Sequence, residues 1–313
     1  MAMTVVILIL AACFTGCGND DRGAENQDET GKVSVCASFY VMYDFAGKIG
    51  GDKVTVTNLL PAGSDPHTWE PSPRDIVNIQ NADVLVYNGA GMERWIDKVL
   101  ASIENDDITT VDASMNVKLL EVKLQIPGRE PVDEEQGHGH VYDPHVWLDP
   151  SRAKIQMRAI TDAFIEADPE NKDYYEKNYE HYAKELDKLD DEYREAAARF
   201  TKKDVVVSHA AFGYLCDAYG LNQVAVSGLD GESEPTGSRM VDVSDFIKEN
   251  RVGYVFVDKH ASAKVMESIS KSTGARMEVL NPVASLSPEE IKAGKDYFMI
   301  MRENLEVLKK ALN

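Results

Sequence analysis

Three of the seven histidines have sequence settings that could present an imidazole to a bound metal ion. His67 and His145 each follow an Asp-Pro dipeptide, and His209 follows a short β-rich run. A proline before the histidine restricts the backbone that carries the ring. A single histidine at a strand end is more commonly a hydrogen-bonded structural residue, so the prediction depends on the three together.

The donor type indicates which metal such a site would take. Neutral imidazole suits Zn²⁺, Cu²⁺ and Ni²⁺, whereas Mn²⁺ and Mg²⁺ prefer carboxylate oxygens. Three histidines and one further ligand form a tetrahedral zinc shell. We therefore predict a Zn²⁺ site, with Mn²⁺ as the less favoured ion. Carboxylates beside the histidines could accept the far ring N–H and fix the tautomer, and the candidates are Asp65, Glu70, Asp143 and Asp149.

A second histidine motif, Gly137-His138-Gly139-His140, ends five residues before His145. His138 and His140 are candidates for an auxiliary or fourth metal ligand. The segment could be a low-affinity scavenger that supplies the main site, and it could equally be the polar tip of a loop. The sequence does not separate these two interpretations.

The elements around the histidines alternate short β-rich runs with helical patterns, which predicts βαβ units and largely parallel sheets. We expect strands over 33–38, 54–58, 84–87, 109–111, 205–208, 224–226, 252–257 and 277–280. We expect helices over 41–49, 73–81, 93–103, 150–167, 171–200, 212–219, 239–249, 263–273 and 288–312. The three histidines fall where a strand or loop gives way to a helix. In open α/β sheets, ligands bind at the carboxyl ends of the strands.

The fold class expected from this order is α/β, with two similar parallel-sheet lobes joined by one long helix. A nearly Gly- and Pro-free segment over 171–200 carries one apolar stripe with helical spacing. Such a helix would be roughly 45 Å long, which suits a rigid connection. The predicted organisation is a first lobe over 32–167, a linker helix over 168–203 and a second lobe over 204–313.

The N-terminus indicates export. Residues 1–17 resemble a lipoprotein signal peptide, with cleavage before Cys13 or Cys17, and residues 18–31 have the composition of a flexible tether. We expect an extracytoplasmic protein that is lipid-anchored to the bacterial cell membrane. Cys36 and Cys216 are expected to be buried free thiols. The formal net charge of −20 argues against nucleic-acid partners and against attraction to anionic lipid headgroups.

The motifs together resemble one known family. They include Gly63-Ser64-Asp65-Pro66-His67, Tyr87–Glu93, Asp143-Pro144-His145-Val146-Trp147-Leu148-Asp149-Pro150, Ser208–Tyr214 and the closing helix over 297–312. In this order they resemble the ZnuA-like zinc- and manganese-binding receptors of bacterial ABC importers, also called cluster A-I solute-binding proteins. The resemblance covers nearly the whole chain from Lys32 onward.

The resemblance implies a binding function without catalysis. It implies a metal site in the cleft between the lobes, with His67 and His145 from one lobe and His209 from the other. A histidine at the third place, where manganese members commonly have Glu, favours zinc. We therefore expect high-affinity extracytoplasmic capture of zinc by a monomer that delivers it to an ABC permease in the membrane.

Two positions depart from the family pattern. Ala284 stands where members often have an acidic fourth ligand, so the fourth position is expected to take water, His138 or His140, or a nearby carboxylate. Asp258 stands where relatives usually have Glu. A manganese or iron receptor on the same fold and a zinc-dependent hydrolase are the alternative functions. Adhesion to host surfaces has no discriminating feature in the sequence.

Overall fold

The computed structural model describes residues 31–122, 124–129, 142–229, 234–258 and 263–313. Lys32–Asn313 forms one compact unit. The predicted signal peptide, nearly all of the predicted tether, and His138 and His140 lie outside the described residues. Within the part of the chain that is described, no helix is both long and apolar enough to cross a membrane.

The first lobe contains a parallel four-stranded sheet in the order β2-β1-β3-β4. Its strands are β1 (Val33–Ala37), β2 (Val54–Asn58), β3 (Val84–Tyr87) and β4 (Thr109–Asp112). The helices between them are α1 (Tyr40–Gly50), α2 (Pro73–Gln80) and α3 (Ile96–Leu100), with a 3₁₀ turn η1 (Gly51–Lys53) before β2. The start of α2 is fixed by a capping box between Ser72 and Asp75, with Pro73 in the first turn.

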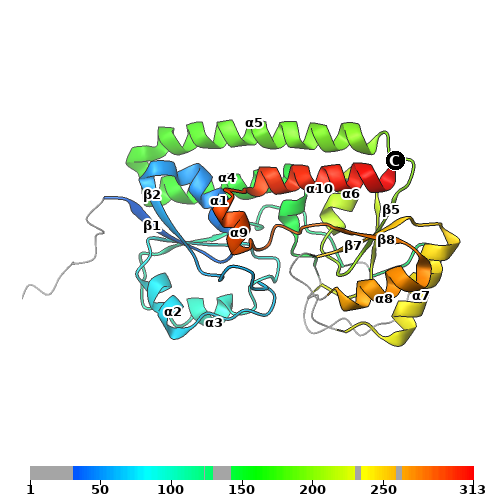
Figure 1. The fold of residues 1–313 in the computed structure, drawn as a ribbon. Helices are drawn as coiled ribbons and strands as arrows, with labels where there is room; N and C mark the ends of the chain where they lie inside the picture. Colours follow the sequence, from blue (N-terminus) through cyan, green and yellow to red (C-terminus); the bar gives the residue numbers. More distant parts are fainter. Residues whose placement is uncertain (1–30, 123, 130–141, 230–233, 259–262) are drawn as a thin grey trace, which may run out of the picture. The chain divides into compact units, whose positions relative to one another are not determined.

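The second lobe repeats this build. Its parallel sheet has the order β6-β5-β7-β8, which is the order of the first sheet with the strands renumbered. The strands are β5 (Asp204–Val207), β6 (Asn222–Ala225), β7 (Tyr254–Val257) and β8 (Arg276–Val279). The helices between them are α6 (Gly213–Tyr219), α7 (Gly237–Glu249) and α8 (Lys264–Thr273). The predicted fold class of two similar parallel-sheet lobes is confirmed (Figure 1).

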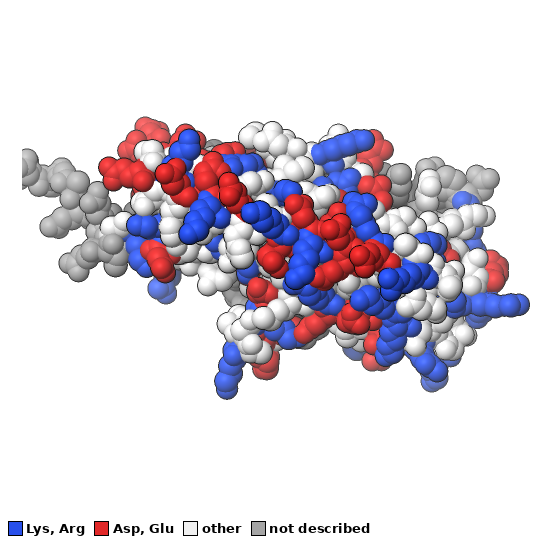
Figure 2. All heavy atoms as spheres, turned by 90° about the horizontal axis from the view of Figure 1, so that it is seen from above, with Lys and Arg blue, Asp and Glu red and all other residues white. Residues whose placement is uncertain are grey.

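Two helices and two 3₁₀ turns link the sheets: η2 (Val146–Leu148), α4 (Pro150–Ala167), η3 (Pro169–Asn171) and α5 (Lys172–Ala197). With 26 residues, α5 is about 39 Å long. It packs against α1 and α4 on one side of the molecule and against α6 on the other. Its apolar stripe, predicted from the sequence, is buried at Tyr175, Leu186, Leu189 and Tyr193. Seen from the α5 side, the surface carries interspersed acidic and basic side chains (Figure 2).

The prediction of one closing helix over 288–312 is wrong. The structure has two helices, α9 (Pro288–Lys292) and α10 (Tyr297–Leu312). Gly294 lies between them with φ of +67°, a conformation that glycine adopts without steric cost. The Asp296 side chain then accepts the backbone N–H of Met299 and starts α10 as its N-cap.

One apolar core runs through both lobes beneath the long helices. It joins residues of the first sheet and α1 to residues of the second sheet and α10. The rings of Phe45 in α1 and Tyr297 in α10 lie edge to face with their centroids 5.0 Å apart. The Tyr193 hydroxyl donates to the Met301 carbonyl over 2.6 Å, which ties α5 to α10. Cys36 and Cys216 are buried free thiols, as predicted.

Candidate metal centre

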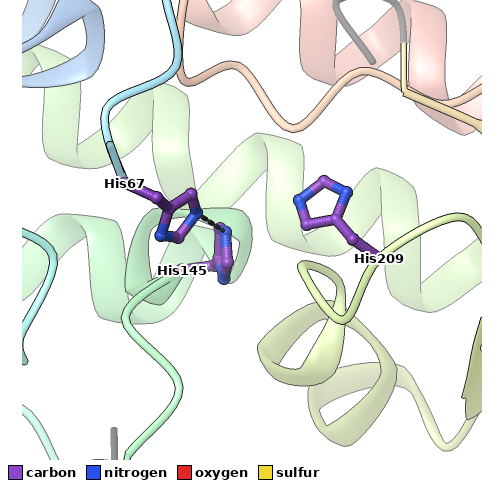
Figure 3. A group of neighbouring side chains, drawn as sticks. All are labelled: His67, His145 and His209. Carbon is purple, nitrogen blue, oxygen red and sulfur yellow. Dashed lines mark hydrogen bonds between the residues drawn. The ribbon is translucent and has the colours of Figure 1, made fainter. Parts of the chain in front are cut away.

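The three candidate histidines come from three separate loops and face one another (Figure 3). His67 lies in the loop after β2, His145 lies directly before η2, and His209 lies two residues after β5. The first two loops belong to the first lobe and the third belongs to the second lobe. Residues far apart in the chain thus meet where the two lobes come together.

The repeated Asp-Pro-His motif has the same local geometry in both places. The Asp65 Oδ1 atom accepts the backbone N–H of His67 over 2.8 Å, and the Asp143 Oδ1 atom accepts that of His145 over 2.9 Å. The intervening proline has no N–H to compete for the carboxylate. Each aspartate therefore closes a tight local turn that fixes the backbone of the histidine after it.

The ring nitrogens are close enough to share one ion. The Nε2 atoms of His67 and His145 are 3.1 Å apart, and one nitrogen from each of the three rings lies within 4.8 Å of the others. Tetrahedral zinc with Zn–N bonds of about 2.05 Å would separate its nitrogens by about 3.3 Å. The pair in the first lobe is near that spacing, so a shift of His209 by about an ångström or slightly more would bring all three nitrogens close to it.

The rings are withdrawn from solvent. His67, His145 and His209 are 6%, 1% and 5% exposed. The ring centroids are 5.0 Å apart for His67 and His145, 5.7 Å for His145 and His209, and 6.4 Å for His67 and His209. Buried imidazoles that converge in this way fit a soft-to-borderline divalent cation, which needs nitrogen donors and little water.

A carboxylate sets the tautomer of His145. The Asp143 Oδ1 atom lies 2.8 Å from His145 Nδ1, which places a proton on Nδ1 and directs the lone pair of Nε2 to a bound cation. Burial raises the pKa of Asp143 to about 7, and the hydrogen bond from the His145 backbone opposes that rise. A cation bound at the rings would favour the charged carboxylate.

The other predicted carboxylates have different positions. The Asp149 Oδ1 atom accepts the backbone N–H of Ser151 as the N-cap of α4, and its Oδ2 atom pairs with Arg152 over 2.8 Å. Glu70 is exposed, and Asp65 bonds the His67 backbone. Asp143 is thus the one of the four that bonds a ligand ring nitrogen among the contacts described.

Sequence reasoning did not associate Asp258 with a ligand, yet its Oδ2 atom lies 3.8 Å from His209 Nδ1. The signal that could have found it is positional. Asp258 directly follows β7, and His209 follows β5, the neighbouring parallel strand. Parallel neighbours end at the same edge of a sheet, so side chains just beyond them are close.

The segment 281–285 holds the first-lobe loops in place. The Trp147 Nε1–H donates to the Pro282 carbonyl over 2.7 Å, and the Gly63 N–H donates to Ser285 Oγ over 2.9 Å. Val283 has φ of +62°, a strained conformation for a β-branched residue. The carbonyl of the Asn281 side chain accepts the Val283 N–H over 2.8 Å and stabilises it. Ala284 is buried in this segment and offers no donor atom.

Two parallel-sheet lobes that bring buried imidazoles together define a two-lobed metal-binding protein. Residues 35–311 match the family described as the periplasmic component A of the zinc-uptake complex. The chain therefore belongs to the ZnuA family.

The relatives named for zinc are similar over most of this chain. The high-affinity zinc uptake system protein ZnuA of Bacillus subtilis is 38% identical over 98% of this chain and 97% of its own length. The zinc-binding lipoprotein AdcA of Streptococcus pneumoniae is 35% identical over 98% of this chain. This chain spans 60% of the length of AdcA.

Solved structures show the same fold. The Zn(II)-bound ZnuA-like domain of S. pneumoniae AdcA has a TM-score of 0.77 at 35% identity, over 90% of this chain and 99% of that one. The metal-dependent lipoprotein YcdH of B. subtilis has a TM-score of 0.78 at 38% identity, over 90% and 100%. The laminin-binding protein Lmb of Streptococcus agalactiae, described as a bifunctional adhesin and metal transporter, has a TM-score of 0.78 at 31% identity, over 90% and 100%.

Proposed function

We propose that this chain captures Zn²⁺ outside the cytoplasm through His67, His145 and His209 and delivers it to the permease of an ABC importer. The observation that carries the proposal is the group of three buried imidazoles with ligand atoms within 4.8 Å of one another. Family membership and relatives named for zinc uptake and zinc binding support the cargo and the partner.

The donor set favours zinc over manganese and iron. Three imidazole nitrogens suit Zn²⁺, whereas Mn²⁺ binds oxygen ligands better. Ala284 supplies no carboxylate, so the fourth position is left to water, to His138 or His140, or to a nearby carboxylate. Both lobes contribute ligands, so the bound ion links them and reduces their relative motion, which a permease can recognise.

The cycle is one of binding and release. A zinc hydrolase would also keep water in the fourth position, so it is the alternative from a different class. Its usual His-Glu-x-x-His pattern does not occur in the sequence, and Asp143 is already bonded to His145. A zinc-dependent turnover of ester or peptide substrates would revive this alternative.

The mature protein is proposed to be a monomer that is held at the membrane by a lipid on Cys13 or Cys17. The apolar run before these cysteines supports the lipid anchor, as does the name of the relative AdcA, a zinc-binding lipoprotein. Mass spectrometry of the membrane-extracted protein identifies which cysteine carries the lipid. Absence of a lipid from both Cys13 and Cys17 would contradict the anchor.

A zinc titration in competing chelator tests the site. His67→Ala, His145→Ala and His209→Ala should each weaken the affinity by at least about 100-fold, because each removes a direct ligand of a shell of four. His181→Ala is the control, since His181 is exposed on α5. Affinity close to the wild type in all three ligand variants would refute the site. Tighter binding of Mn²⁺ than of Zn²⁺ in competition would refute the cargo.

Adhesion is a second candidate function, favoured by the similarity to the laminin-binding protein Lmb at 31% identity. Purified protein with and without zinc can be tested for binding to immobilised laminin. Absence of saturable binding in both states would exclude it.

A further inference from the structure

We infer that Asp258 is a positioning residue for zinc capture: it orients His209 from behind the ring, as Asp143 does for His145. The inference depends on the proposed function because it assigns a role at the same site. It concerns the second lobe, which contributes one ligand where the first lobe contributes two. The orientation of the His209 ring therefore determines how strongly the second lobe binds the ion.

The backbone brings Asp258 beside His209. In the β5–β7 pair, Val206 lies opposite Val255 and Val207 lies opposite Phe256. The pairing continues beyond the strands, because the Ser208 N–H donates to the Phe256 carbonyl over 3.0 Å. Extending this register by two residues places Asp258 opposite His209.

A side-chain contact fixes the same position. The Asp258 N–H donates to Ser208 Oγ over 3.1 Å. The backbone of Asp258 is thereby attached to the residue directly before His209. This hydrogen bond and the sheet register together keep the Asp258 carboxylate close to the His209 ring.

A carboxylate oxygen of Asp258 faces the ring nitrogen of His209 that it would orient. Asp258 Oδ2 lies 3.8 Å from His209 Nδ1, with the two side chains 13% and 6% exposed. The corresponding distance between Asp143 and His145 is 2.8 Å. A separation of 3.8 Å is longer than an N–H···O hydrogen bond and is within reach of one after a shift of about an ångström.

The orientation assigns Asp258 to the back of the ring and not to the ion. The second ring nitrogen of His209, the one that does not face Asp258, points toward the other two histidines in Figure 3. Among the described residues, the group that could hold a metal ion consists of the three histidines. A carboxylate at Nδ1 keeps the proton there and leaves Nε2 for the cation. Binding a cation polarises the Nδ1–H, which strengthens its attraction to Asp258.

The test is a double-mutant cycle between Asp258 and His209, read as zinc dissociation constants in competing chelator. Asp258→Ala should weaken zinc binding by about tenfold, the lower end of what loss of an orienting carboxylate costs. In the His209→Ala background the same change should alter affinity less than about twofold, because the ring that it orients is gone. A general structural role, or a long-range attraction for the cation, would persist in that background.

Asp204→Ala is the matched control. Asp204 begins β5, at the opposite end of the strand from His209, and its removal changes the net charge equally. It should leave zinc affinity unchanged. Urea unfolding of each metal-free variant checks that the fold is retained. We expect Asp258→Ala to retain it, because Asp258 is partly exposed and lies beyond the end of β7.

The outcomes separate this inference from the proposed function. Loss of affinity in His209→Ala with none in Asp258→Ala overturns the role of Asp258 and leaves the site intact. An equal loss from Asp258→Ala in both backgrounds also overturns it. Unchanged affinity in His209→Ala would instead refute the proposed site, and the role of Asp258 would fall with it.

Discussion

Replacing Glu93 with glutamine should change how the stability of the metal-free protein depends on pH. The Glu93 carboxylate is buried. Its Oε1 atom accepts Ser38 Oγ–H over 2.7 Å and the Asn88 N–H over 2.8 Å, and its Oε2 atom accepts the Gly89 N–H over 3.1 Å. The Asn88 side chain in turn donates to the carbonyl of Pro144, the residue before His145.

Burial raises the pKa of Glu93 from 4.5 to about 7, against the opposing effect of these hydrogen bonds. Between these two pH values the folded protein holds a proton that the unfolded chain has released. Stability therefore falls as pH rises through this window. A shift of this size costs about 3 kcal/mol by pH 7, of which about 2 kcal/mol is lost between pH 5 and pH 7.

Urea unfolding of metal-free protein at steps from pH 5 to pH 7 measures the effect. Glu93→Gln cannot titrate, so its stability should lose about 2 kcal/mol less than the wild type over that range. The variant also loses the bond from the Gly89 N–H, which lowers its stability by about 1–3 kcal/mol at every pH and leaves the slope unaffected. The control is Glu104→Gln, because Glu104 is exposed. If the wild type and Glu93→Gln have the same slope, burial does not control this carboxyl group.

Three further predictions concern the site and the long helices. Asp143→Ala should weaken zinc binding by about 10–100-fold in a chelator competition, since the orienting contact to His145 is lost, and unchanged affinity would contradict that role. Free zinc at about 1,000 times its dissociation constant should stabilise the folded protein by about 4 kcal/mol. Thermal unfolding should show the matching rise in Tm in the wild type and not in His145→Ala. Tyr193→Phe should lower the free energy of unfolding by about 0.5–1.5 kcal/mol, because it removes the hydrogen bond from the tyrosine hydroxyl to the Met301 carbonyl. Tyr179→Phe, on a half-buried tyrosine of the same helix, is the comparison, and equal losses would argue against this bond.

Much of the fold could be predicted because its signals are local. The strands over 54–58 and 84–87 agree with β2 and β3 at both ends, since short β-branched runs between turn residues determine a strand by themselves. The helix over 150–167 also agrees, because Pro150 starts it and Asp168-Pro169 ends it. The break between α9 and α10 was missed. The apolar period continues across it, while the conformation of Gly294 and the cap at Asp296 interrupt the backbone.

The roles of the carboxylates could not be predicted from the sequence. Asp143 lies two residues before His145 in the chain, and Asp149 lies four residues after it. Asp143 bonds the ring, whereas Asp149 caps α4 and pairs with Arg152. The difference comes from the direction in which each side chain leaves the turn, and packing sets that direction.

By itself the sequence determined the donor chemistry, the alternation of strands and helices, and the Asp-Pro-His turns that present two of the rings. These features depend on residue type and on near neighbours, which the chain order states directly. Only the tertiary structure decided that the Nε2 atoms of His67 and His145 approach to 3.1 Å and that Asp258 stands behind His209. Those distances depend on the sheet register and on the packing of both lobes beneath α5, which join residues that the chain itself keeps far apart.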